Sequence, residues 1–122
     1  MADVSSAEVL TALMDASAYP HPAEDVTHIE THISHVLLAG EFAYKIKKPV
    51  SLGFLDYSTL ALRKRCCEDE VRLNARLCAD VYLGVVPVTR RRGRVEIDGH
   101  GEVVDYAVKM RRVSQPTGRW MN

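Results

Sequence analysis

The chain has 122 residues, enough for one small domain with a modest hydrophobic core. Its 16 basic and 16 acidic residues cancel, whereas dedicated nucleic-acid binders and membrane-surface proteins usually carry a basic excess, so we expect neither class. No apolar run is long enough to span a bilayer, and Asp3 and Glu8 stand where a secretory signal would have lysines and an apolar stretch, which predicts a cytoplasmic protein.

Residues 1–25 are predicted to form a short helix and a linker. Ser5 and Glu8 match a capping box, and apolar residues follow on one helical face up to residue 17, where prolines soon end the pattern. We expect this helix to cover one edge of a sheet rather than to form a separate binding module.

Residues 26–30 and 36–39 are predicted to form a strand pair joined by a turn at 31–35. His28, Glu30 and His32 fall on one face of the first strand, an arrangement that could bind a transition metal. The alternative is the solvent-exposed face of an outer strand. We favour it because no further ligand clusters nearby, and therefore predict no metal site.

The next strand alternates two kinds of side chain. In Phe-Ala-Tyr-Lys-Ile-Lys at 42–47, large apolar or aromatic residues alternate with Ala43, Lys45 and Lys47, and Pro49 ends the strand. One face should therefore be packed and the other lined with lysine. Taken alone, Lys45 could be a solvated lysine on an edge strand.

A long helix is predicted from Ser58 to about Val81. The apolar stripe that should pack on the sheet consists of Leu62, Cys66, Leu73 and Leu77, while the basic residues, Arg63 among them, are expected mainly on the outer faces. Glu70 falls on the apolar stripe. Because a buried carboxylate is costly without a cation, we predict an ion pair between Glu70 and Lys45, with Lys47 as the alternative partner.

The three cysteines, Cys66, Cys67 and Cys78, are odd in number and lack the paired C-x-x-C spacing of metal sites. We therefore predict three reduced thiols.

The rest of the chain is rich in strands. Gly84 is predicted to close the helical region, and strands at 85–89 and 94–98 should flank an arginine-rich hairpin tip at 90–93. Residues 102–113 show the longest alternation and should form a central strand, with one face made of Val104, Tyr106, Val108 and Met110. The predicted fold class is α+β, an antiparallel sheet of about five strands with one long packed helix and a short N-terminal helix.

Six segments, in order along the chain, carry a resemblance to a known family. They are Glu-Thr-His-Ile-Ser at 30–34, Ala-Tyr-Lys-Ile-Lys-Lys-Pro-Val at 43–50, Gly-Phe-Leu-Asp-Tyr-Ser-Thr-Leu at 53–60, Glu-Val-Arg-Leu-Asn at 70–74, Tyr-Leu-Gly-Val-Val-Pro-Val at 82–88 and Met-Arg-Arg at 110–112. These segments resemble the bacterial aminoglycoside-phosphotransferase-like family, which has a protein-kinase-like fold and in which some members continue into a P-loop ATPase domain. The resemblance implies that residues 26–113 form the small lobe and that residues 114–122 form the hinge and a truncated tail.

The resemblance also implies a nucleotide site for ATP with Mg²⁺. Lys45 would hold the α- and β-phosphates, Glu70 would orient Lys45, and the turn with His32 and Ser34 would cover the nucleotide, although it lacks the glycines usual in kinases. Arg112 completes the implied nucleotide-binding residues.

The parts that perform phosphoryl transfer are missing from this sequence. It contains no H-x-D followed by an Asn, no D-F-G and no G-x-x-x-x-G-K-[ST], and in the kinase-like fold the first two come from the large lobe. We therefore expect no catalytic residue here and interpret the chain as part of an ATP-dependent phosphotransferase that is inactive alone. Its expected partners are a weakly bound nucleotide and the missing large lobe or another protein. The alternative is a stand-alone interaction module without catalysis.

Overall fold

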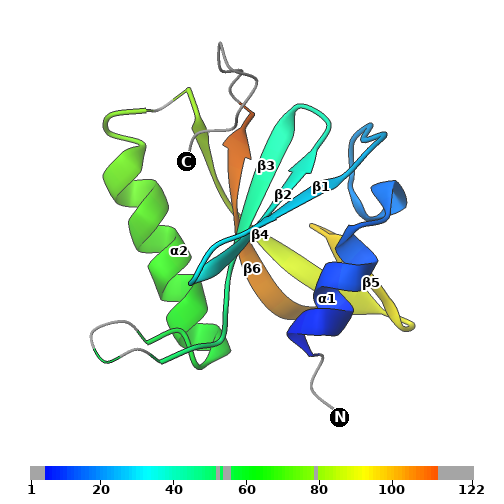
Figure 1. Ribbon diagram of the computed structural model, residues 1–122, viewed down its shortest axis with the longest axis horizontal. Coiled ribbons are helices and arrows are strands. Elements are labelled where there is room, and N and C mark those ends of the chain that lie inside the picture. The colour runs from blue at the N-terminus through cyan, green and yellow to red at the C-terminus, as the bar shows by residue number, and fades with distance from the viewer. Residues whose placement is uncertain (1–4, 52, 54–55, 79, 113–122) are drawn as a thin grey trace.

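The computed structural model describes residues 5–51, 53, 56–78 and 80–112. Six antiparallel strands form one curled sheet in the order β1-β2-β3-β6-β4-β5, with helix α2 on one side and helix α1 on the other (Figure 1). In chain order the elements are α1 (Ser6–Leu13), the 3-10 helix η1 (Ala16–Ala18), β1 (Thr27–Glu30), β2 (Ser34–Ala39), β3 (Phe42–Lys47), α2 (Leu60–Asn74), β4 (Tyr82–Arg91), β5 (Arg94–Ile97) and β6 (Glu102–Arg111). The predicted α+β class and the central position of the last strand are confirmed, with six strands instead of about five.

The alternation of β3 divides the core into two hydrophobic clusters. Tyr44 and Ile46 belong to the cluster beneath α1, whereas Ala43 belongs to the cluster beneath α2. Because successive side chains of a strand point to opposite faces, Lys45 and Lys47 share the α2 face with Ala43. The prediction of a packed face and a lysine-lined face is confirmed, but the lysine-lined face is covered as well.

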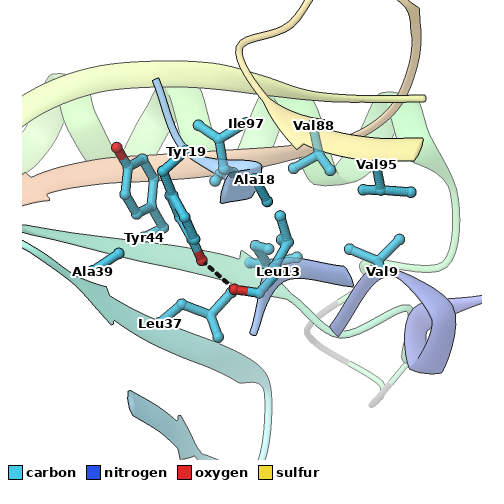
Figure 2. Packing of buried hydrophobic residues seen from close by; sticks show 12 residues of the cluster. Val9, Leu13, Ala18, Tyr19, Leu37, Ala39, Tyr44, Val88, Val95 and Ile97 are labelled. Carbon is cyan, nitrogen blue, oxygen red and sulfur yellow. Dashed lines mark hydrogen bonds between the residues drawn. The ribbon is translucent and has the colours of Figure 1, made fainter. Parts of the chain in front are cut away.

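The α1 side of the sheet is closed by the N-terminal segment. The Ser5 side chain caps α1 by accepting a hydrogen bond from the Glu8 N–H at 3.1 Å. Val9 and Leu13, four residues apart on one face of this helix, are buried. The Tyr19 hydroxyl donates a hydrogen bond to the Leu13 carbonyl at 2.7 Å, as Figure 2 shows. The helix ends at Leu13 rather than at residue 17, and its side chains are part of the same hydrophobic cluster as those of the strands.

The long helix is shorter than predicted and is rotated about its axis. α2 begins after Thr59, whose hydroxyl accepts a hydrogen bond from the Leu62 N–H, and ends at Asn74, well before Val81. Cys67 is buried where Cys66 was predicted to be, and two members of the predicted stripe are exposed, Leu73 by 53% and Leu77 by 87%. The apolar spacing failed because polar contacts to the sheet, described below, set which face of the helix is turned inward.

The Asn74 side chain marks the end of this helix. Its amide donates a hydrogen bond to the Glu70 carbonyl at 2.8 Å, and the Cys78 N–H turns back to the Asn74 carbonyl at 2.8 Å. Asn competes with the helical hydrogen-bond ladder in this way, which favours helix ends over helix interiors.

The observed strands differ from the predicted ones at two register shifts between β4 and β6. Gly84 lies within β4, at a shift between Tyr82 and Gly84, instead of closing the preceding region. The pairing also jumps where Val88 faces Asp105 and Thr89 faces Val103, so that Val104 is an extra residue in β6. This bulge reverses the alternation, and Val104 therefore packs with the α1-side cluster, away from its three predicted companions.

Other predicted features are also accounted for. The arginine-rich hairpin tip is confirmed but is shorter than predicted, because β4 continues to Arg91 and is joined to β5 through Arg92 and Gly93, both with positive φ. The three cysteines are free, as predicted. No helix in the described ranges is long and apolar enough to cross a membrane. The predicted hinge and tail at 114–122 lie outside the described residues.

Candidate functional site

The predicted ion pair between strand and helix is present. The Lys45 ammonium lies 2.9 Å from Oε2 of Glu70, and the Lys47 ammonium lies 2.5 Å from Oε1 of the same carboxylate. The two lysines were predicted as alternatives, but Glu70 accepts hydrogen bonds from both. One carboxylate of α2 thus ties together two positions of β3.

This cluster is buried. The side chains of Lys45 and Lys47 are each 7% exposed and that of Glu70 is 13% exposed. β3 lies between β2 and β6, and Lys45 is paired with Val36 on one side and Val108 on the other. Lys45 is therefore an interior lysine, and its interpretation as a solvated edge residue is wrong.

The surroundings keep the Glu70 carboxylate charged. Burial by itself would raise the pKa of Glu70, but hydrogen bonds from Lys47 and Lys45 and their positive charges outweigh it, so the pKa is lower than usual. Burial also raises the pKa of the neighbouring Tyr82, and the negative charge of Glu70 raises it further. The Glu70 carboxylate is thus a fixed negative charge near neutral pH rather than a proton donor.

Further groups lie around Lys47. Its ammonium lies 5.5 Å from the ring centroid of Tyr57, within the range of a cation–π contact. Ser34 pairs directly with Lys47 across β2 and β3, so both side chains share the α2 face, and Ser34 is only 3% exposed. The structure therefore brings Ser34, Lys47 and Glu70 to one end of the α2 face.

The turn before β2 is tighter than predicted, because Ser34 and His35 already belong to the strand. The Thr31 N–H donates to the Ser34 carbonyl at 2.9 Å, and the Ser34 N–H donates to Oγ1 of Thr31 at 3.0 Å. Among the described residues, the N–H groups of His32 and Ile33 have no such acceptor. They are therefore the amides that this turn can offer to a ligand.

The other two implied nucleotide-binding residues lie apart from the cluster. His32 is exposed within the turn, and Arg112 is exposed just beyond β6. The Arg112 N–H donates to the Glu41 carbonyl at 2.8 Å, next to the start of β3, while Lys47 is at the end of that strand. The structure thus places Arg112 at the opposite end of β3 from Ser34.

A second buried ion pair was missed by the sequence analysis. Nε of Arg63 lies 3.2 Å from Oδ1 of Asp105, with side chains 12% and 8% exposed, and Arg63 also donates a hydrogen bond to the Tyr57 carbonyl at 3.0 Å. Burial raises the pKa of Asp105, and the Tyr106 N–H and Arg63 counteract the rise in part. Asp105, which stands directly between Val104 and Tyr106 in the predicted central strand, was the signal that could have indicated a cationic partner.

The donor set of this face can be compared with the needs of ATP and Mg²⁺. Ammonium and free amide groups are suitable donors to phosphate oxygens. A magnesium ion prefers carboxylate oxygens, but in the described part of the face the carboxylate beside Lys45 is Glu70, which both lysines already bind. The residues thus fit the phosphates and do not fit the metal, for which ligands would have to come from elsewhere.

Comparisons with known proteins identify similar sequences in mycobacteria. The uncharacterized proteins Rv2004c of Mycobacterium tuberculosis and Mb2027c of Mycobacterium bovis are each 42% identical to the chain over 101 residues. The aligned part is 80% of this chain but 19% of either relative, so the chain spans about a fifth of the length of these curated proteins. No model of a protein family matches the chain, and no solved structure matches it significantly.

Proposed function

We propose that this chain is the nucleotide-binding small lobe of an ATP-dependent phosphotransferase of the aminoglycoside-phosphotransferase-like family. The observation that carries the proposal is the pair of Lys45 and Glu70, 2.9 Å apart between a strand and the helix packed on it. In the kinase-like fold a pair of this kind positions the lysine against the phosphates of the nucleotide.

Each group in the proposed site has a separate role. Lys45 binds the α- and β-phosphates, and Glu70 holds the lysine in place under α2. The amides of His32 and Ile33 in the turn cover the phosphates, with Ser34 at the turn's base. Bound ATP supplies the phosphoryl group, and this chain's residues bind and orient it.

The chain is proposed to be inactive by itself. Transfer needs an aspartate at the acceptor hydroxyl and carboxylates for Mg²⁺. In the described cluster both oxygens of Glu70 are bound by lysines, so this carboxylate is not proposed as a metal ligand. In relatives about four times as long as this chain, a large lobe would supply both the aspartate and the carboxylates. Nucleotide affinity of the chain alone should therefore be weak.

The test is to titrate the chain with ATP in the presence of Mg²⁺, to follow binding by chemical-shift changes, and to measure phosphate release. We expect weak binding that Lys45→Met reduces by about tenfold or more, which corresponds to 1.4 kcal/mol or more, and no release above background. Lys48→Met is the matched control because Lys48 pairs with Glu30 outside the cluster, at 2.7 Å. Circular dichroism would verify that each variant is folded.

Three outcomes would contradict the proposal. ATP binding that is unchanged in Lys45→Met would show that this lysine does not bind the phosphates. An equal loss in Lys48→Met would indicate nonspecific attraction between lysines and phosphate. Phosphate release that disappears in Lys45→Met would show that the chain is an enzyme by itself.

A second candidate, an interaction module without catalysis, is favoured by one observation. Leu73, Leu77 and Leu83, from the end of α2 to the start of β4, are 53%, 87% and 41% exposed. A contiguous patch of exposed apolar side chains often marks a surface that another protein or domain covers, and these three leucines are the candidates for such a patch. Absence of any ATP-dependent shift in the titration would favour this second function.

A further inference from the structure

Three metal-ligating side chains meet on the β1–β2 hairpin, on the sheet face opposite the Lys45–Glu70 pair. Glu30 and His35 pair directly across the two strands, and His28 lies two residues before Glu30 on the same face. Nε2 of His28 is 2.9 Å from Nδ1 of His35. One ligand atom from each of the three residues lies within 4.8 Å of the others.

These distances suit a shared metal ion. Zinc binds imidazole nitrogen at about 2.0–2.1 Å, so two nitrogens on a tetrahedral ion are about 3.3 Å apart. The two rings of this hairpin would need to separate by only a few tenths of an ångström. Without a metal, two facing imidazole nitrogens must share one proton as donor and acceptor, and a cation can take the place of that proton.

The cluster is anchored on one side and open on the other. His35 is 9% exposed, whereas the Glu30 side chain is 57% exposed at the outer strand of the sheet. The buried imidazole has little freedom to move, and water can reach the exposed side as a fourth ligand. Two imidazoles, a carboxylate and an open position form a ligand set typical of zinc and its neighbours in the first transition row.

Lys48 competes with a metal for the carboxylate. Its ammonium lies 2.7 Å from Oε2 of Glu30. A bound cation has to displace or share this contact and is repelled by the ammonium charge. The natural affinity is therefore held below that of the three ligands alone, and removal of the Lys48 charge should raise it.

We propose that His28, Glu30 and His35 form a binding site for a divalent late transition metal such as Zn²⁺, which links β1 to β2. This trio differs from the arrangement of His28, Glu30 and His32 expected on one strand, because His32 is exposed in the turn and His35 takes its place from the neighbouring strand. The site uses none of the cluster residues assigned to the nucleotide and stands independently of that proposal.

The test is calorimetric titration of the tag-free chain with Zn²⁺, together with visible absorption of the Co²⁺-substituted protein. We expect one ion per chain and a tetrahedral cobalt spectrum without a thiolate charge-transfer band. His28→Gln should weaken binding by about tenfold or more, since even residues that only support metal ligands contribute about that much. His32→Gln, a histidine of the same hairpin outside the cluster, should bind as the unmodified chain does.

Two further variants sharpen the test. Lys48→Gln should bind Zn²⁺ more tightly, because the competing ammonium is gone while the ligands remain. Glu30→Gln, at an exposed position, replaces His28→Gln if that variant does not fold. The proposal is overturned by an unmodified chain that binds no Zn²⁺, by equal losses in His28→Gln and His32→Gln, or by a thiolate band that assigns the metal to cysteine.

Discussion

Substitution of Glu70 by Gln should destabilise the fold far more than substitution of a surface carboxylate. Gln keeps nearly the same shape but removes the charge that the buried Lys45 and Lys47 share. The two ammonium groups, each on a side chain 7% exposed, would then have lost their common carboxylate. Removal of one partner from a buried ion pair costs about 3–5 kcal/mol because the remaining charge stays desolvated.

The expected loss can be measured by equilibrium unfolding in guanidinium chloride, followed by circular dichroism. We expect the free energy of unfolding of Glu70→Gln to fall by about 3 kcal/mol or more. For a chain of this size that corresponds to a decrease in Tm of roughly 10 °C or more.

Asp69→Asn is the matched control on the neighbouring helical position. Asp69 pairs with Arg72 at 3.2 Å, but their side chains are 49% and 65% exposed. Exposed pairs of this kind contribute about 0–1 kcal/mol, since water screens both charges. The difference in stability loss between Glu70→Gln and Asp69→Asn therefore reports the effect of burial rather than the mere loss of a carboxylate.

The dependence on pH provides an independent check. The pKa of Glu70 in the folded protein is lowered, so its contribution is fully present above the unfolded pKa of about 4.3 and is lost as pH falls through the folded pKa. The stability difference between the unmodified chain and Glu70→Gln should thus be constant near neutral pH and should shrink in acid. A difference no larger than that of Asp69→Asn, or one that persists in acid, would refute the reasoning.

Three other predictions concern the sheet, a turn and the thiols. Asp105→Ala should lower the free energy of unfolding by about 3 kcal/mol in a denaturant titration, because it leaves the buried Arg63 without its carboxylate; a loss like that of a surface pair would contradict this. Gly40→Ala should lower the Tm and reduce the free energy of unfolding by more than about 1 kcal/mol, since Gly40 has φ +62° and a Cβ there would clash with the Pro22 carbonyl oxygen. An unchanged Tm would count against this turn geometry. Thiol titration without reductant should find three thiols per denatured chain, and finding one would mean that a disulfide is present. In the native protein the exposed Cys78 should react before Cys67, because burial raises the pKa of the Cys67 thiol to about 12.

Local patterns determined much of this fold. The alternation at 42–47 predicted a strand with two different faces, and a carboxylate on the inner stripe of the following helix predicted which residues would meet across them. That prediction succeeded because it rested on physical necessity: a buried carboxylate needs a cation, and only one nearby strand offered lysines on a single face. The α+β class followed from the same periodicities.

The sequence was less informative where distant residues had to meet. The rotation of α2 depends on Arg63 reaching Asp105 of β6, a partner 42 positions away in the chain. The apolar stripe is read from the helix's own residues alone, so it predicted that Cys66 would be buried, whereas Cys67 is the buried cysteine. The bulge at Val104 likewise follows from pairing with β4 and leaves little local trace.

The histidine cluster illustrates the same limit. Spacing on β1 singled out His28 and Glu30, because both lie on one face of a single strand. The third member, His35, comes from the opposite strand, and the length of the turn between β1 and β2 decides which residue faces Glu30. Side chains that alternate along one strand can be predicted from the sequence, whereas the register between two strands is set by turn geometry and packing, which only the tertiary structure reveals.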